Sequence, residues 1–222
     1  MKNIFTVLLA TIGVSSAIHA GQTVKMVDPK TIRFTMPTVA ADDIQFVVPT
    51  KESFEGAPQF HEDEWGQLEF FPKTRLAEIQ KMLKELKSFE KKNRTQYGWN
   101  DIYARKTSRS PILPLEVSIK DLSSLVSAQL KAAPILLTAS RPLGQVKDGF
   151  AIKLGTNAHL YGLSNTKGIT VLGAHLEGAD DMLLTNAFNQ LNKRYGLILV
   201  DWRQQFVLVS MAPNGQIDVW KP

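Results

Sequence analysis

The sequence contains no cysteine among its 222 residues. The protein therefore has no disulfide bond, no thiolate nucleophile and no thiolate metal ligand. It also lacks the lipidated cysteine that anchors bacterial lipoproteins. Secreted animal domains of this size usually carry disulfides, so an exported chain without cysteine is more typical of the periplasm of a Gram-negative bacterium.

Sequence motifs for several common activities are also absent. The sequence has neither a phosphate-binding glycine loop with its lysine nor a dinucleotide-binding fingerprint. Residues 162–166 begin like the nucleophile elbow of serine hydrolases. However, Thr166 replaces the closing glycine, and an extended run follows where that motif requires a helix. The sequence therefore predicts neither nucleotide binding of these types nor this kind of serine hydrolysis.

No concentrated basic block is present. The chain has 26 basic and 21 acidic residues and a formal net charge of +5. Nucleic-acid binding needs a clustered basic patch, so we expect no nucleic-acid partner. The small excess of positive charge predicts at most a weak attraction to anionic surfaces.

One long apolar segment stands at the N-terminus. Lys2 precedes the apolar residues 4–14 and the small residues 15–20, a pattern typical of a secretory signal peptide. This apolar core is shorter than the ~20 residues that span a bilayer. We therefore expect cleavage after Ala20, or after Ala17, and no membrane anchor in the mature protein. We expect a soluble periplasmic protein, with extracellular release as the alternative.

The C-terminal end of the chain has the strongest β-strand pattern. Residues 197–200 and 206–211 are largely apolar, and residues 217–220 alternate between apolar and polar side chains. Asp201 is suited to begin a type I turn, and residues 212–215 (APNG) are suited to a second turn. These patterns predict a three-stranded antiparallel meander.

The middle strand of this meander is apolar on both faces. Alternation should place Phe206 and Leu208 on one face, and Val207, Val209 and Met211 on the other. We therefore expect both faces to be covered by other parts of the chain.

Helices are predicted over residues 73–93, 121–131 and 178–194. The first has an apolar stripe at steps of three and four residues, formed by Leu76, Ile79, Leu83 and Leu86. Asp121 is suited to cap the second helix, and Gly196 to end the third. Further strands are predicted over residues 134–138, 150–154, 159–163 and 169–172. Leu68 and Phe70 alternate with polar neighbours, as in an edge strand.

These elements predict an α+β fold with a mostly antiparallel β-sheet covered by about three helices. We expect one domain over residues 21–222. A division near residue 110, within the loop of residues 108–114, is the alternative.

Two groups of polar residues were considered as metal or catalytic sites. Residues 61–64 (HEDE) lack the second histidine of a zinc-protease helix, because Trp65 occupies that position, and we interpret them as a surface loop. The chain passes from a predicted strand to the N-terminus of a predicted helix at His175, Glu177 and Asp180. His159 could join these residues from a neighbouring strand. The simpler interpretation is that Asp180 complements the helix dipole and His175 lies in a loop. We therefore predict no catalytic residue, no metal site and no cofactor, and keep His175, Glu177 and Asp180 as candidates.

Four aromatic residues are predicted to bind a partner. Trp65, Trp99, Tyr103 and Trp202 are large anchors of the kind found at binding surfaces, although such residues fill protein cores equally well. Trp202 should be exposed because it falls in the first predicted turn of the meander. Trp65 and Trp99 flank the long helix and are expected to form one patch.

Three functions remain open on this sequence. The first is an exported protein that binds another macromolecule of the cell envelope, either as an immunity-type protein or as an accessory factor. The second is a metal-dependent hydrolase that uses His175, Glu177 and His159. The third is a small-ligand carrier with its pocket in the loops between the central strands. A structure that placed His159 and His175 side by side with an acidic group in one cleft would overturn the first.

Overall fold

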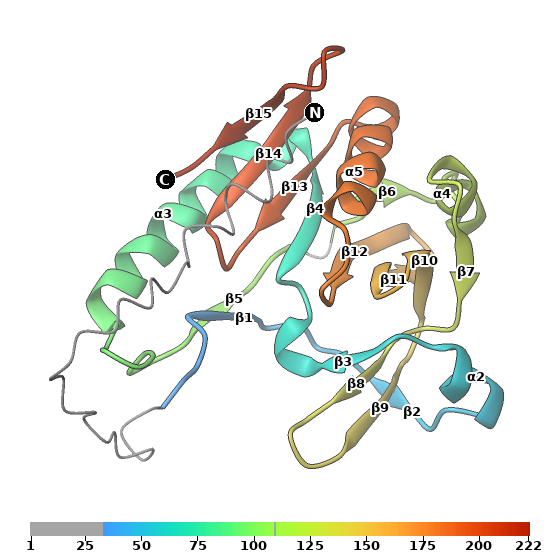
Figure 1. The fold of residues 1–222 in the computed structure, drawn as a ribbon, viewed down its shortest axis with the longest axis horizontal. Coiled ribbons are helices and arrows are strands. Elements are labelled where there is room, and N and C mark those ends of the chain that lie inside the picture. The colour runs from blue at the N-terminus through green and yellow to red at the C-terminus, as the bar shows by residue number, and fades with distance from the viewer. Residues whose placement is uncertain (1–32, 109) are drawn as a thin grey trace, which may run out of the picture.

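The computed structural model describes residues 33–108 and 110–222. The predicted signal peptide, residues 1–20, lies outside these residues. The fold is α+β and is dominated by antiparallel strands, as predicted (Figure 1). In the described part of the chain, no helix combines the length and the apolar composition that crossing a bilayer requires.

The largest sheet has nine strands in the order β15-β14-β13-β4-β12-β11-β10-β7, with β6 paired to β12. All of its pairs are antiparallel. The strands are β4 (Leu68–Pro72), β6 (Leu113–Pro114), β7 (Gln129–Lys131), β10 (Gly149–Gly155), β11 (Ala158–Asn165), β12 (Gly168–Leu176), β13 (Leu197–Asp201), β14 (Phe206–Met211) and β15 (Ile217–Trp220). The last three form the predicted C-terminal meander. The expectation that residues 68–70 lie in an edge strand is wrong, because β4 pairs with both β12 and β13.

Two smaller sheets complete the fold. A four-stranded sheet has the order β2-β9-β8-β3, and β1 pairs in parallel with β5. The strands are β1 (Thr38–Ala40), β2 (Phe46–Val47), β3 (Gln59–His61), β5 (Tyr103–Arg105), β8 (Ile135–Leu137) and β9 (Pro142–Val146). Strands from both sides of residue 110 share the two larger sheets, since β3 pairs with β8 and β4 pairs with β12.

The first and third predicted helices are confirmed. The short 3-10 helix η4 (Lys73–Arg75) leads into α3 (Leu76–Asn93), and α5 (Asp181–Tyr195) ends at Gly196, whose φ of 64° is left-handed. A further helix, α2 (Lys51–Gly56), was not predicted. It begins at Thr50, whose side chain accepts a hydrogen bond from the Ser53 amide.

The second predicted helix has different bounds. Helix α4 (Ile119–Leu125) is capped by Ser118, and Asp121 is the reciprocal member of the capping box. The helix stops early because Ser127 adopts a left-handed φ of 50°, which turns the chain into β7. The helix predicted over residues 121–131 was therefore wrong in its cap and in its C-terminal half.

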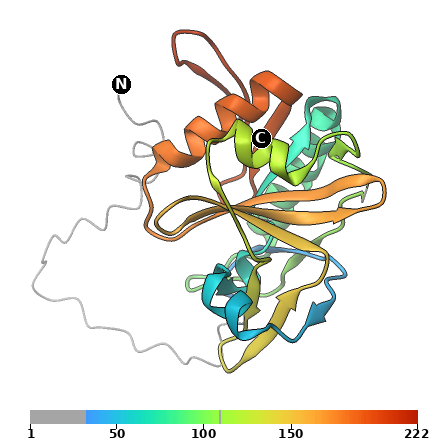
Figure 2. The ribbon, with the colours of Figure 1, turned by 90° about the vertical axis from the view of Figure 1, so that its right-hand side faces the viewer.

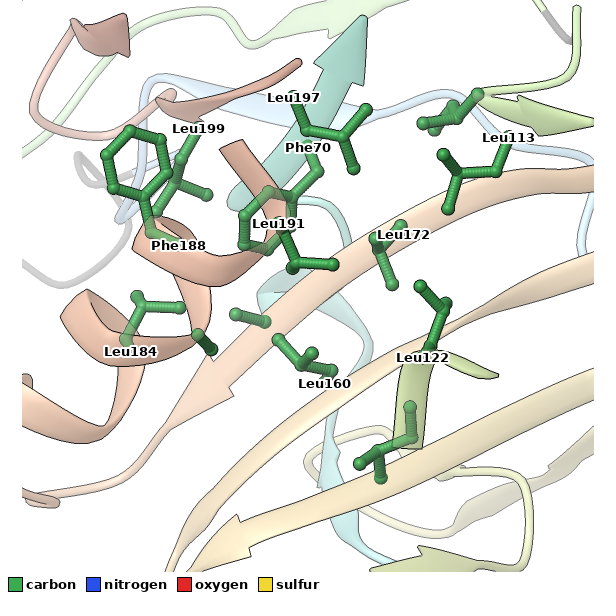
Figure 3. Close-up of a cluster of buried hydrophobic side chains, with 14 of the residues drawn as sticks. Phe70, Leu113, Leu122, Leu160, Leu172, Leu184, Phe188, Leu191, Leu197 and Leu199 are labelled. Atoms are coloured by element: carbon green, nitrogen blue, oxygen red, sulfur yellow. The ribbon is translucent and has the colours of Figure 1, made fainter. Parts of the chain in front are cut away.

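Three apolar clusters hold these layers together, and the main sheet contributes to all of them. The first lies between the main sheet and α4 and α5 (Figure 3). The second lies between α3 and the strands of the meander. The third lies between the main sheet and the four-stranded sheet. Each buried Leu or Phe in such a cluster contributes roughly 1.5–3 kcal/mol of transfer free energy.

Strand β14 follows the predicted alternation except at one residue. Phe206 and Leu208 belong to the first cluster, and Val207 and Val209 to the second. Met211 was expected beside Val209, but it packs against the first cluster instead. The reason is a register shift between β14 and β15 after Leu208, which changes the face of the residues that follow.

A glycine in β12 makes room for a buried tyrosine of the third cluster. A Cβ atom on Gly173 would lie 2.7 Å from Cζ of Tyr161. The Tyr161 ring has little freedom to move, because its hydroxyl accepts a hydrogen bond of 2.7 Å from the Gly66 amide. A side chain at residue 173 would therefore strain this contact.

We predict that Gly173→Ala lowers the free energy of unfolding by about 1–3 kcal/mol, the usual cost of overpacking a core. Urea denaturation would measure it. Gly56→Ala is the matched control, because a Cβ there meets no atom within 4 Å. It should leave stability unchanged or raise it by up to about 1 kcal/mol. Equal stability of the two variants would contradict the tight contact at Tyr161.

Candidate functional site

Four polar residues form a row across one face of the main sheet. Gln129 of β7 is the register partner of Lys153 of β10, which is in turn the partner of His159 of β11. His159 is the partner of His175 of β12. Because side chains directly opposite each other in a sheet share a face, these residues lie side by side at the end of that face.

This polar row continues the apolar third cluster. Ala151, Tyr161 and Val171 occupy the same face further inside, beneath the four-stranded sheet. Figure 2 shows α4 and α5 on one side of β11 and β12, and α2 with the four-stranded sheet on the other. The apolar layer therefore opens into a polar edge where β10 and β11 turn and β12 ends.

A cleft of about 420 Å³ lies at this edge. One wall is formed by Lys153, His159 and His175 of the polar row, together with Lys131, Asn157 and Glu177. The other wall is residues 55–59, from the end of α2 to the start of β3. The backbone of Glu177 is held in place because its amide donates a hydrogen bond of 3.0 Å to the Asn157 carbonyl. The predicted residues His159, His175 and Glu177 thus share one cleft.

His175 is the more deeply placed of the two histidines, with 9% of its surface exposed. Its ring stacks on Phe60 of β3, with the centroids 4.4 Å apart and the planes inclined by 13°. Burial lowers the pKa of His175, and the negative charges of Glu64 and Glu177 oppose that effect. The net result is a pKa below the ordinary value of 6.5.

His159 is half-buried and lies in a more positive environment. Burial lowers its pKa to about 4, and His175, Lys153 and Lys131 add to the effect. Both imidazoles are therefore neutral at pH 7, so each has one N–H donor and one acceptor nitrogen. Within the described residues, no protein group hydrogen-bonds to either ring. These nitrogens are free to bind a ligand in the cleft.

The three-ligand metal site considered from the sequence is not assembled. Among residues 33–108 and 110–222, no group of three or more His, Asp and Glu side chains is arranged to hold a metal ion. Asp180 instead caps α5, where its Oδ1 accepts a hydrogen bond of 2.9 Å from the Met182 amide. The sequence interpretation of Asp180 as a helix residue is confirmed, and the placement of His175 in a loop is wrong because it ends a strand.

No family model, curated protein or solved structure matches this chain.

Two of the predicted aromatic anchors are inside the protein. Trp202 has 0% of its surface exposed and donates a hydrogen bond of 2.8 Å from Nε1 to Oε2 of Glu69. Trp65 is 2% exposed and donates one of the same length to Oδ2 of Asp42. The expected exposure of Trp202 was therefore wrong. Each indole is buried because an acidic partner satisfies its N–H group.

The other two aromatic anchors lie near α3. Trp99 is partly buried beneath the guanidinium of Arg94, which is 5.5 Å from its ring centroid. Tyr103 is also partly buried and donates a hydrogen bond of 3.2 Å to Oε2 of Glu85. Trp65 lies in the third cluster, so the patch expected from Trp65 and Trp99 is not formed.

A different apolar surface was not recognised from the sequence. Phe46, Val47, Val48 and Phe54 are all exposed, and Val48 is 92% exposed. They fall in residues 46–54, which include β2 and part of α2. β2 is an edge of the four-stranded sheet. Strand character in residues 44–48 is visible in the sequence, but exposure is not, because it depends on which sheet edge the strand occupies.

We predict that both cleft histidines titrate below 6.5, the ordinary pKa of histidine. An NMR titration should give a midpoint near pH 4 for His159 and a midpoint below 6.5 for His175. The unfolded chain takes up protons first, so these groups should lower stability as pH falls from about 6.5 towards 4. Ordinary midpoints near 6.5 for both rings would contradict their burial in the cleft.

Proposed function

We propose that this chain is an exported periplasmic protein that binds a small polar ligand in the cleft at His159 and His175. The observation that carries the proposal is that two neutral imidazoles line one cleft and that neither has a hydrogen-bond partner among residues 33–108 and 110–222. Imidazole nitrogens that line a cleft without a protein partner can donate to or accept from a ligand. Export is supported by the signal-peptide pattern of residues 1–20.

The size and construction of the cleft support a small ligand. Its volume of about 420 Å³ lies within the range of ligand sites, roughly 300–1,000 Å³. One wall comes from the central strands and the turn between β10 and β11, where a small-ligand carrier was expected to have its pocket, and the other comes from residues 55–59. The juxtaposition of His159, His175 and Glu177 in one cleft is the arrangement that we expected to overturn the macromolecule-binding interpretation drawn from the sequence, so ligand binding is proposed first. The strands that carry His159 and His175 also hold the hydrogen-bonding groups of these side chains in a rigid sheet.

Native mass spectrometry of protein freshly isolated from the periplasm tests this proposal. We expect a fraction of the wild-type protein to carry a bound small molecule, and both His159→Gln and His175→Gln to retain at least tenfold less of it. His61→Gln is the matched control, because His61 does not line the cleft, and it should retain the ligand. Equal ligand content in all four proteins, or none in the wild type, would overturn the proposal.

A second function, binding of a protein partner in the cell envelope, is supported by the exposed apolar residues 46–54. β2 forms an open edge of its sheet, so its outward backbone groups are available to an added strand. Phe46, Val47 and Val48 provide apolar contacts at that edge. We infer that the partner contributes an extended segment that pairs with β2, since backbone pairing and apolar side chains are the two features the edge offers.

Chemical crosslinking in intact periplasm followed by quantitative mass spectrometry would test this second function. The double variant Val48→Ser/Phe54→Ser should reduce recovery of one crosslinked partner at least tenfold. Leu115→Ser is the matched control, because Leu115 is equally apolar and exposed but lies elsewhere in the fold. A partner recovered equally with both variants does not bind at the exposed apolar surface of residues 46–54.

A further inference from the structure

The charges around the cleft are divided between its two ends. Lys153 of β10 is the register partner of His159, and Lys131 of β7 lines the same cleft; both lower the pKa of His159. Glu177 follows β12 and raises the pKa of His175, as does Glu64, which lies outside the cleft lining and is paired with Arg203. The cleft therefore has a cationic end and an anionic end, with the two neutral imidazoles in the region between them.

This separation fits a ligand that carries both charges. A purely anionic ligand would meet the carboxylate of Glu177, and a purely cationic one would meet the two lysines. Glu55, on the opposite wall, adds a further carboxylate that disfavours an anion. A zwitterion can satisfy both ends at once.

The geometry of the sheet sets the length of that ligand. Lys153 and His175 lie on strands β10 and β12, two strand spacings apart, or about 10 Å. A free amino acid is too short to span this distance, whereas an extended chain covers about 3.3–3.6 Å per residue. Two or three residues therefore match both the span and the volume of the cleft.

We propose that the cleft binds a short zwitterionic peptide of about two or three residues, with its carboxylate at Lys131 and Lys153 and its ammonium group at Glu177. The imidazoles of His159 and His175 supply a donor and an acceptor to its peptide groups. This inference rests on the proposed ligand-binding function and adds the chemical class of the ligand.

A titration with three peptides tests the charge requirement. Trialanine has both charges, N-acetyl-trialanine lacks the ammonium group, and trialanine amide lacks the carboxylate. The chain has 4 histidines, one of them within the predicted signal peptide, so the imidazole NMR signals of the mature protein are few. We expect trialanine to shift the signals of His159 and His175 but not of His61, and each blocked peptide to bind at least tenfold more weakly.

Charge-removing variants assign the two ends. Lys153→Gln should weaken binding of trialanine about tenfold and leave binding of trialanine amide unaffected. Glu177→Gln should likewise weaken binding of trialanine about tenfold and leave binding of N-acetyl-trialanine unaffected. Lys147→Gln and Glu116→Gln are matched controls, since both residues are exposed and neither lines the cleft.

The outcomes separate the two proposals. Equal binding of trialanine and a blocked peptide would overturn the zwitterion inference and leave ligand binding in place. If acetate or inorganic phosphate shifts the signals of His159 and His175 while trialanine does not, the zwitterion inference is likewise overturned and ligand binding stays in place. If none of these compounds shifts them and the freshly isolated protein carries no ligand, both proposals fail.

Discussion

The buried guanidinium of Arg105 is the interaction on which the arrangement of the layers depends. Arg105 is 1% exposed and donates hydrogen bonds of 2.7 Å to Oγ1 of Thr38 and 2.5 Å to the carbonyl of Gly66. Its guanidinium carbon lies 4.7 Å from the centroid of a Trp202 ring, whose indole is bonded to Glu69. Burial lowers the pKa of Arg105 to about 10, so the side chain is still charged at pH 7. Removing one partner from a buried charged network typically costs 3–5 kcal/mol.

This network reaches the cleft through a chain of contacts. Gly66, which accepts from Arg105, donates its amide to the hydroxyl of Tyr161. The ring of Tyr161 lies 5.1 Å from that of Phe60, and Phe60 stacks on His175. Tyr161 is also two residues from His159 on the same face of β11. The ring of His175 is therefore held against a buried aromatic layer that the Gly66–Tyr161 hydrogen bond anchors, which is the preorganisation that a binding site needs.

The sequence predicted the elements whose pattern is local. The apolar stripe of α3, the end of α5 at Gly196 and the meander all depend on residues within one or two turns or strands of each other. The features that the sequence did not predict depend on contacts between residues that are far apart in the chain. The burial of Trp202 requires Glu69, which lies 133 positions away. The shared cleft of His159 and His175 was raised as a hypothesis, but confirming it required the register of β11 against β12.

Strand β4 shows why a polar residue in an alternating strand is ambiguous. The alternation of Leu68 and Phe70 with polar neighbours predicts an edge strand, yet the polar neighbour Glu69 is 3% exposed in a strand that joins the two halves of the main sheet. It is tolerated there because Trp202 donates to it, and the cation of Arg105 acts on the same network. His175, on the neighbouring strand, is 9% exposed, and no group in the described part of the chain hydrogen-bonds to its ring. Glu69 is covered by the residues that bond to it, whereas His175 lines a cleft in which a ligand or solvent can reach its ring. This difference in access separates a polar residue that holds the fold together from one that can meet a ligand.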